Sequence, residues 1–335
     1  MKLLFPVIAL VILGNIGITL YFYVFNESNK ILIVESYHKE YEWDRSYKEG
    51  LSEKLSGDYE LISFEMDTKR VPSSEYENRA KLAYETFEQT DPSLVILGDD
   101  NALKYLGPRL SKTGVPVVYL GINRNPEDYL GRNTANFTGV LERPLLKRSL
   151  YTVTKILGAD IKKVLVLFDS GTTSKASLDH YFHGSEQINL SGITVDLRLI
   201  GEWDLWKQTV LQSQQNGYDA IFIGLYHTIF DKDDKHINAD RVLTWTTKNT
   251  PVPHFGFWDF SVGPDKTIGG LVLYGKQQGL AAGEIAKRIL AFDKKPSDIA
   301  PKIAERGRYL FSRSLLEKYN LKLPKEFAFE ADFVD

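Results

Sequence analysis

Two adjacent carboxylates and an amide stand together in "GDDNA" (98–102), directly after an apolar run. A metal or acid–base site needs such groups to converge with further ligands, whereas adjacent side chains usually point apart. We therefore expect Asp99, Asp100 or Asn101 to hydrogen-bond a ligand, with capping of the next helix as the alternative. His180 and His183 are spaced to share a helix face but have no third ligand in view, so we expect no metal site.

Aromatic side chains gather in three further turns. "SYHKEYEW" (36–43), "LYHT" (225–228) and "GFWDF" (256–260) each follow an apolar run. Such rings can stack on a flat, partly apolar molecule, and they form a cation cage only if carboxylates converge as well. Filling of the core is the alternative for any one ring. The rings expected to line a common site are Tyr37, His38, Tyr41 and Trp43 on one side and Tyr226 and Trp258 on the other.

No motif of an established catalytic mechanism is present. The sequence lacks G-x-S-x-G, H-E-x-x-H and the glycine-rich phosphate loops, and it contains no cysteine. "SGTTSK" (170–175) is the nearest substitute, because Ser170 and Thr172 precede a helix whose free N–H groups can take an anion. Plain helix capping is the alternative there. We expect no cofactor and no enzymatic activity, and a hydrolase working in the same site is the rival from another class.

The composition and charge exclude other classes. The 335 residues are 43% apolar and 25% charged, and the net charge is -3 without a basic block, so nucleic-acid binding has no electrostatic basis. The stretch from Leu3 to Phe25 is uncharged, matches the roughly 20 residues that cross a bilayer, and ends in aromatic residues. We expect an uncleaved transmembrane anchor within residues 1–29, with a cleaved signal peptide as the alternative.

Short β-branched runs alternate with helical patterns from residue 30 onward. The expected strands are 31–35, 59–65, 93–97, 115–120, 163–168, 193–200, 219–224, 253–257 and 270–274. The expected helices lie near 44–56, 73–89, 101–111, 143–157, 174–189, 204–215, 238–248 and 277–292. This alternation predicts an α/β fold, and "KILIVESY" resembles "KVLVLFDS". We therefore expect two doubly wound parallel-sheet lobes in series, with the ligand beyond the carboxyl ends of their strands.

The order of several motifs resembles a known family. "SYHKEYEW", "GDDNA", "PVVYLGIN" (116–123), "TGVLE" (138–142), "YGKQQGLAAGEIAKRIL" (274–290) and "KYNLKLP" (318–324) look like the ABC-transporter substrate-binding proteins that take up tryptophan and tyrosine. The resemblance implies a type 1 periplasmic-binding fold that traps its ligand by hinge closure. It implies a first lobe of residues 30–140 plus 275–295 and a second lobe of residues 141–274 plus 296–335.

The resemblance also implies ligand contacts and a role. The contacts carried over are Ser36, Tyr37, Asp100, Asn101 and Asn123 in the first lobe and Ser170, Thr172, Tyr226 and Trp258 in the second. The expected role is capture of a small molecule, such as an aromatic amino acid, for an ABC permease, outside a bacterial cell membrane and facing the periplasm or cell exterior. Similar domains occur in sensor proteins, so a membrane-tethered receptor that signals to a partner kinase or diguanylate cyclase is the alternative.

Overall fold

The computed structural model describes residues 29–132, 134–158, 160–304 and 307–335. The expected membrane anchor therefore lies outside the described residues. None of the helices within the described ranges is long and apolar enough to cross a bilayer.

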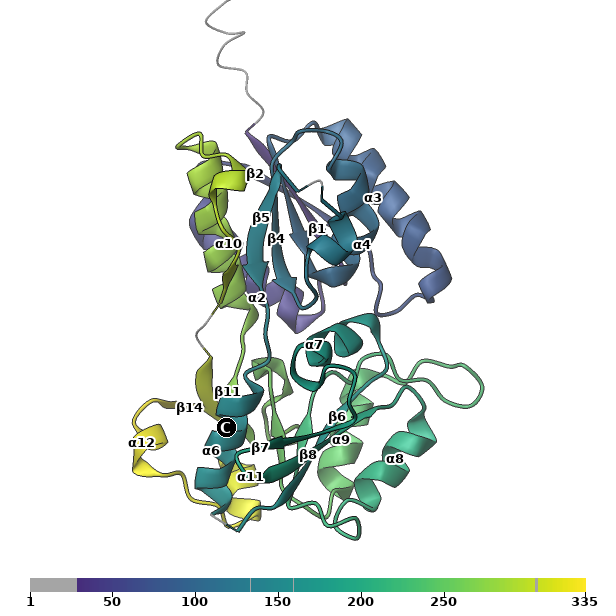
Figure 1. The fold of residues 1–335 in the computed structure, drawn as a ribbon, viewed down its shortest axis with the longest axis vertical. Coiled ribbons are helices and arrows are strands. Elements are labelled where there is room, and N and C mark those ends of the chain that lie inside the picture. Colours follow the sequence, from purple (N-terminus) through teal and green to yellow (C-terminus); the bar gives the residue numbers. More distant parts are fainter. Residues whose placement is uncertain (1–28, 133, 159, 305–306) are drawn as a thin grey trace, which may run out of the picture.

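The first lobe is built on a six-stranded parallel sheet in the order β12-β5-β4-β3-β1-β2 (Figure 1). Its strands are β1 (Lys30–Glu35), β2 (Glu60–Glu65), β3 (Leu94–Gly98), β4 (Val117–Ile122), β5 (Phe137–Leu141) and β12 (Lys302–Ile303). The central strands β3 and β4 are apolar and buried throughout, as expected for strands that are covered on both faces.

Helices cover both faces of this sheet. They are α2 (Glu42–Leu55), α3 (Tyr76–Thr90), α4 (Asp99–Leu110), the short α5 (Glu127–Leu130) and α10 (Gly275–Leu290). Ile31 and Ile33 of β1 point to the α2 and α10 side, whereas Leu32 and Val34 pack with α3 and α4. This alternation along β1 divides the lobe into two apolar layers.

Glycines bring α2 and α10 into close contact. A Cβ atom on Gly279 would lie 1.9 Å from the carbonyl oxygen of Tyr47, and one on Gly50 would lie 2.3 Å from that of Lys276. The two helices can approach this closely only because both positions lack a side chain. The contact fixes α10, which comes late in the sequence, to the helix that follows β1.

The second lobe contains a five-stranded sheet in the order β10-β9-β6-β8-β7, in which only β7 is antiparallel among the described strands. Its strands are β6 (Lys163–Phe168), β7 (Gln187–Leu190), β8 (Ile193–Leu199), β9 (Ala220–Ile223) and β10 (His254–Gly256). Its helices are α6 (Leu146–Leu157), α7 (Thr172–Phe182), α8 (Trp203–Leu211) and α9 (Ala239–Asn249).

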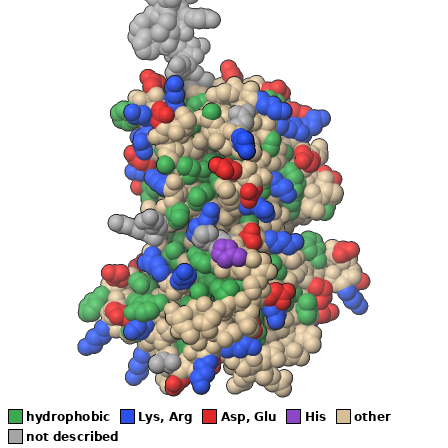
Figure 2. Space-filling view, in the orientation of Figure 1, with side chains coloured by type: hydrophobic (Ala, Val, Ile, Leu, Met, Phe, Trp, Pro, Cys, Tyr) green, Lys and Arg blue, Asp and Glu red, His purple; other side chains and the backbone are tan. Residues whose placement is uncertain are grey.

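A small sheet beside this lobe is formed by β11 (Gly269–Val272), β13 (Arg308–Phe311) and β14 (Ala331–Phe333), with α11 (Arg313–Lys318) and α12 (Lys325–Ala328). The chain passes between the lobes after β5, between β11 and α10, and between β12 and β13. Figure 2 shows the lobes as two masses that meet at a waist, with acidic and basic side chains interspersed on the visible face.

The helix expected over 174–189 is wrong in its second half. It ends at Phe182, because His183 and Gly184 adopt left-handed backbone angles, with φ of 47° and 80°. Residues in this conformation terminate helices. The chain then turns into β7, which pairs with β8.

The boundary expected for the second lobe is also wrong at one point. Residues 296–335 were expected to belong to that lobe, but Lys302 of β12 pairs with Val140 of β5 in the first sheet. The hydroxyl of Thr138 donates to the carbonyl of Ile299 at 2.6 Å, which holds the preceding turn on the same lobe. The stretch that leads into β12 therefore packs with the first lobe before the chain returns to the second.

Candidate functional site

Two neighbouring cavities lie where the lobes meet. The outer cavity has a volume of about 640 Å³ and the inner cavity about 10 Å³. The outer cavity is lined by His38, Glu40, Tyr41, Glu42, Lys69, Arg70, Tyr226, His227, His236, Asn238, Ala239, Asp240, Phe260 and Lys266. The inner cavity is lined by Tyr37, Tyr41, Trp43, Asp99, Glu142, Thr173, Leu225, Trp258 and Phe260. Tyr41 and Phe260 line both, and each cavity receives residues from both lobes.

The carboxyl ends of the strands place these side chains. Tyr37 follows β1, and Asp99 follows β3 with a left-handed φ of 68°. Leu225 and Trp258 follow β9 and β10 in the second lobe. A non-glycine residue in the left-handed region is strained, and such strain often accompanies a functional position. The site therefore lies where an open α/β sheet binds ligands.

Hydrogen bonds hold the lobes against each other. The Tyr37 hydroxyl lies 2.9 Å from the Thr173 hydroxyl, and the Ser177 hydroxyl donates to Asn123 Oδ1 at 2.9 Å. Thr173 and Ser177 belong to α7, which lies against α4 of the first lobe. Each such bond contributes about 1 kcal/mol net. The structure is thus a closed form, and its inner cavity is too small to admit a ligand unless the lobes part.

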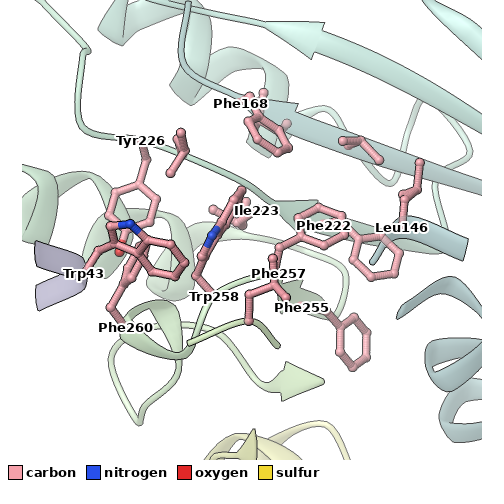
Figure 3. Packing of buried hydrophobic residues seen from close by; sticks show 14 of the residues in the cluster. Trp43, Leu146, Phe168, Phe222, Ile223, Tyr226, Phe255, Phe257, Trp258 and Phe260 are labelled. Carbon is pink, nitrogen blue, oxygen red and sulfur yellow. The ribbon is translucent and has the colours of Figure 1, made fainter. Parts of the chain in front are cut away.

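Aromatic rings form most of the wall between the lobes. Tyr41 of the first lobe packs edge-on against His227, with ring centres 4.9 Å apart, and at a tilt against Phe260, with ring centres 5.7 Å apart. Trp258 stacks on Phe260 with ring centres 6.1 Å apart. Figure 3 shows Trp43, Tyr226, Trp258 and Phe260 gathered at one end of the buried apolar cluster. These contacts bury large rings on both sides of the cleft.

A lysine occupies this aromatic wall. The Lys69 ammonium lies 4.2 Å from the centre of the Tyr37 ring and 4.8 Å from that of Tyr41. The side chain is only 7% exposed, and in the described part of the chain no carboxylate oxygen lies within 4.0 Å of its nitrogen. Burial lowers the pKa of Lys69, while Asp169 and Asp99 act in the opposite direction.

Buried carboxyl groups surround the same region. Asp44, Asp99 and Glu142 are each at most 2% exposed. Burial raises the pKa of all three, and the pKa of Glu142 rises to about 8. Repulsion from the neighbouring carboxyl groups of Asp44 and Glu142 raises the pKa of Asp99 further.

Several of these polar groups have unused hydrogen-bonding capacity. Within the described ranges, Asp99 Oδ2, Trp43 Nε1 and both carboxyl oxygens of Asp44 are buried without a hydrogen-bond partner. Glu142 is better satisfied, because Trp258 Nε1 donates to its Oε1 at 2.6 Å. Buried groups without partners are uncommon, and each one calls for a specific reason. A ligand that reached the inner cavity would meet the Asp99 acceptor and the Trp43 donor.

The structure divides the residues expected from the sequence into two groups. Tyr37, Trp43 and Trp258 line the inner cavity, and His38 and Tyr226 line the outer one. Asn123 joins the lobes through Ser177. Besides Asn123, the expected residues that line neither cavity are Ser36, Asp100, Asn101, Ser170 and Thr172.

The polar groups of the second group are largely used within their own lobe. The Ser36 hydroxyl accepts from the N–H of Ala102 at 2.8 Å. Asp100 accepts from the N–H groups of Asn123 and Arg124. Thr172 is the first residue of α7. These groups tie the strand-end loops together and thereby position the cavity walls.

Lys69 and Glu142 were not expected from the sequence. Lys69 follows β2, so the rule that ligands lie beyond strand ends applies to its loop as well. The loop was not predicted to be part of the site, because it contains no cluster of aromatic or amide side chains. Glu142 lies at the first passage between the lobes, and its burial depends on how the two lobes meet.

No protein-family model and no curated protein matches the sequence. Solved structures do match over most of its length. One is an ABC domain in complex with L-Trp from Streptococcus pneumonia, with a TM-score of 0.68, 17% identity, and coverage of 92% of this chain and 100% of that one. Another is a conserved domain protein from Vibrio cholerae, with a TM-score of 0.69, 14% identity and the same coverage.

A third similar structure is a ligand-free, open substrate binding protein with adhesive properties from Clostridium difficile. Its TM-score is 0.62 at 13% identity, and 91% of this chain and 99% of that chain are covered. Similarity at such low identity establishes the fold. The chain therefore has the type 1 periplasmic-binding fold found in substrate-binding proteins, as expected from its sequence.

Proposed function

We propose that the protein is an extracytoplasmic solute-binding protein that captures a small molecule between its lobes for an ABC-type importer. The observation that carries this proposal is the inner cavity, to which both lobes contribute side chains. A ligand bound between the lobes at this point would touch Asp99 of the first lobe and Trp258 of the second, and so would draw the lobes together around it. Ligand binding and lobe closure are then the same event.

The lining favours a ligand that is flat and partly apolar. Tyr37, Tyr41, Trp43, Trp258 and Phe260 offer ring faces or edges, and Asp99 adds an unpaired acceptor. Aromatic rings stack well on other planar groups. An aromatic amino acid or a molecule of similar shape fits this lining, and the structurally similar domain from Streptococcus pneumonia was solved with L-Trp.

The site does not resemble a catalytic centre. Thr173 carries the aliphatic hydroxyl in the lining of the inner cavity, and its hydrogen-bond partner is the Tyr37 hydroxyl rather than a base. The outer cavity contains His38, His227 and His236, but among the described residues no cluster of His, Asp or Glu is arranged to hold a metal ion. This lining supports binding over hydrolysis.

A thermal-shift screen of small metabolites tests the proposal. A ligand present at about 100 times its dissociation constant adds about 2.7 kcal/mol to the free energy of unfolding. A hit should also make the protein more compact in small-angle X-ray scattering and should be recovered unchanged. A hit that is converted to a product would replace the proposal with an enzyme, and a hit without compaction would contradict capture between the lobes.

We further propose that residues 3–25 hold the protein in a bacterial cell membrane, with the lobes facing the periplasm or cell exterior. The apolar segment ends just before β1, whose first residue is Lys30. The full-length protein should stay with membranes through a high-salt wash. A mature N-terminus near residues 26–30, found by mass spectrometry, would contradict the anchor.

A sensory receptor for a partner kinase or diguanylate cyclase is the second candidate. The observation in its favour is the short distance in sequence between the apolar segment and β1, which would keep the lobes near the bilayer. Deleting the gene and measuring uptake of the identified ligand separates the two roles. Lost uptake supports import, whereas normal uptake with a changed transcriptional or cyclic-nucleotide response supports sensing.

A further inference from the structure

The cleft between the lobes contains a positively charged side chain of the protein itself, that of Lys69. The Lys69 ammonium lies over the rings of Tyr37 and Tyr41, at 4.2 and 4.8 Å from their centres. Both distances are within the roughly 6 Å over which an aromatic face attracts a cation. Both rings also line the inner cavity, next to Trp43 and Trp258. Tyr37, Tyr41, Trp43 and Trp258 therefore form an aromatic cage around the inner cavity, and the Lys69 ammonium lies against the two tyrosines of this cage.

The charges around the cage favour a second cation over an anion. Asp44, Asp99 and Glu142 are buried nearby, and each one interacts electrostatically with Lys69 or with another member of the group. Nearby basic groups are engaged elsewhere. Lys48 pairs with Glu35 at 2.8 Å, and Arg143 donates to main-chain carbonyls, including that of Asn123 at 2.7 Å. Burial raises the pKa of all three carboxyl groups. A ligand cation beside them would be stabilised as they ionise, whereas an anion would be repelled by their charged forms.

Asp99 supplies the direct contact that a cation needs. Its Oδ2 atom is buried, faces no hydrogen-bond donor in the described part of the chain, and belongs to a residue that lines the inner cavity. Its Oδ1 atom lies 3.4 Å from the Tyr37 hydroxyl. A carboxylate with an unused oxygen beside aromatic rings is the arrangement that binds ammonium groups.

The Lys69 side chain can also move out of the aromatic cage into the outer cavity. Its side chain lines the outer cavity, whose walls carry the carboxylate of Asp240 as well as those of Glu40 and Glu42, which already lie near basic side chains. The long, flexible stem allows the ammonium to move from the rings toward these groups. A ligand cation that entered the cage could therefore displace the lysine without leaving its charge unpaired.

We propose that the ligand is an organic ammonium ion and that Lys69 occupies its place in the aromatic cage until the ligand displaces it. This inference rests on the proposed function and names the chemical class of its ligand. Lys69 is then a specificity-determining residue: it competes with weak cations and excludes ligands that lack a positive group. A carboxylate on the ligand is not required for binding.

Calorimetry with three compounds of similar shape tests this assignment. Phenethylamine is a cation, phenylethanol is neutral and phenylpropionate is an anion. The full-length wild-type protein should bind phenethylamine and bind the other two at least about tenfold more weakly. Lys69→Met, which keeps the length and removes the charge, should bind phenethylamine about tenfold more tightly. Asp99→Asn should bind it about tenfold more weakly.

Lys104→Met is the matched control. Lys104 also holds its ammonium over a tyrosine ring, 4.7 Å from the centre of Tyr105, but it is exposed and lines neither cavity. Its affinity for phenethylamine should equal that of the wild type. Circular dichroism shows whether each variant is folded. If Lys69→Met does not fold, the comparison of the three compounds on the wild-type protein still tests the inference.

Two results would overturn the inference. Phenylpropionate could bind the wild type and lose affinity in Lys69→Met, which would make Lys69 an anchor for a ligand carboxylate. Alternatively, phenethylamine could fail to bind at millimolar concentration while an uncharged or anionic metabolite binds and compacts the protein. That result would support capture between the lobes but contradict an ammonium ligand. If no compound binds and nothing compacts the protein, the proposed function fails too.

Discussion

The hydroxyl of Tyr37 lies 2.9 Å from the hydroxyl of Thr173, and this hydrogen bond joins the two lobes. Tyr37 follows the first strand of one lobe, and Thr173 lies in the first turn of α7 in the other. The bond can exist only when the lobes are closed. It therefore reports directly on the equilibrium between open and closed forms.

Thr173→Val should shift this equilibrium toward the open form. Valine has nearly the same shape but cannot make the bond, so closure should weaken by about 1 kcal/mol and ligand affinity by about fivefold. Scattering from the ligand-free protein should show a larger radius of gyration. The control is Thr209→Val, because the Thr209 hydroxyl donates to the Leu205 carbonyl within α8, away from the contact between the lobes. Equal dimensions for both variants would show that the Tyr37 contact does not hold the lobes.

Trp258→Phe should weaken binding while the fold is retained. The substitution keeps an aromatic ring against Phe260 but removes the N–H that donates to Glu142 at 2.6 Å. A buried acceptor left without its donor costs about 1–3 kcal/mol. Isothermal titration with an identified ligand should show the loss. Asn101→Ala provides the contrast, since Asn101 donates to Thr68 and lines neither cavity, so it should lower the melting temperature more than the affinity.

The stability of the ligand-free protein should fall as the pH rises, because of Glu142. Burial raises the pKa of Glu142 to about 8 from an ordinary 4.5. Between these values the folded protein retains a proton that the unfolded chain has released, so the contribution of this group decreases by about 1.4 kcal/mol per pH unit. Below pH 4.5 both states are protonated and the effect disappears.

Chemical denaturation of the wild type and Glu142→Gln across this pH range measures the effect. The difference between their free energies of unfolding should change with the predicted slope, since glutamine does not titrate. Glu60→Gln, at an exposed position on β2, should follow the wild type. Parallel pH profiles for the wild type and Glu142→Gln would show that Glu142 is ionised in the folded protein.

Gly279→Ala should destabilise the first lobe. The new Cβ atom would lie 1.9 Å from the Tyr47 carbonyl oxygen, so α2 and α10 would have to move apart. Overpacking of this kind costs about 1–3 kcal/mol. Gly57→Ala is the control, because no atom lies within 4 Å of its added Cβ. Similar denaturation midpoints for the two variants would contradict the close helix contact.

Strong local patterns made the sheets predictable. The run that becomes β3 is apolar along its whole length, and those that become β1 and β6 are apolar except at their ends; all three are largely buried in the structure. The later strands β13 and β14 were missed, because they are short, half-exposed and depend on pairing with β11. A local hydrophobic pattern does not predict strands that form only by pairing with segments far away in the sequence.

The site could be predicted only in outline. The clustering of rings after strands pointed to Tyr37, Trp43 and Trp258, which line the inner cavity, because strand ends are where α/β folds bind ligands. The positions of Lys69 and Glu142 depend on how the lobes close over them. A single charged side chain in a polar loop is ordinary in a sequence, and it becomes informative only when its burial is known.

Capture of a small molecule between the lobes can be detected by native mass spectrometry of the full-length protein after incubation with a bacterial metabolite extract. We expect a complex of one chain with one small molecule, and loss of most of that complex in the double variant Asp99→Asn, Trp258→Phe, which alters one inner-cavity residue from each lobe. The absence of any bound small molecule, or an equally abundant complex with the folded double variant, would contradict capture between the lobes.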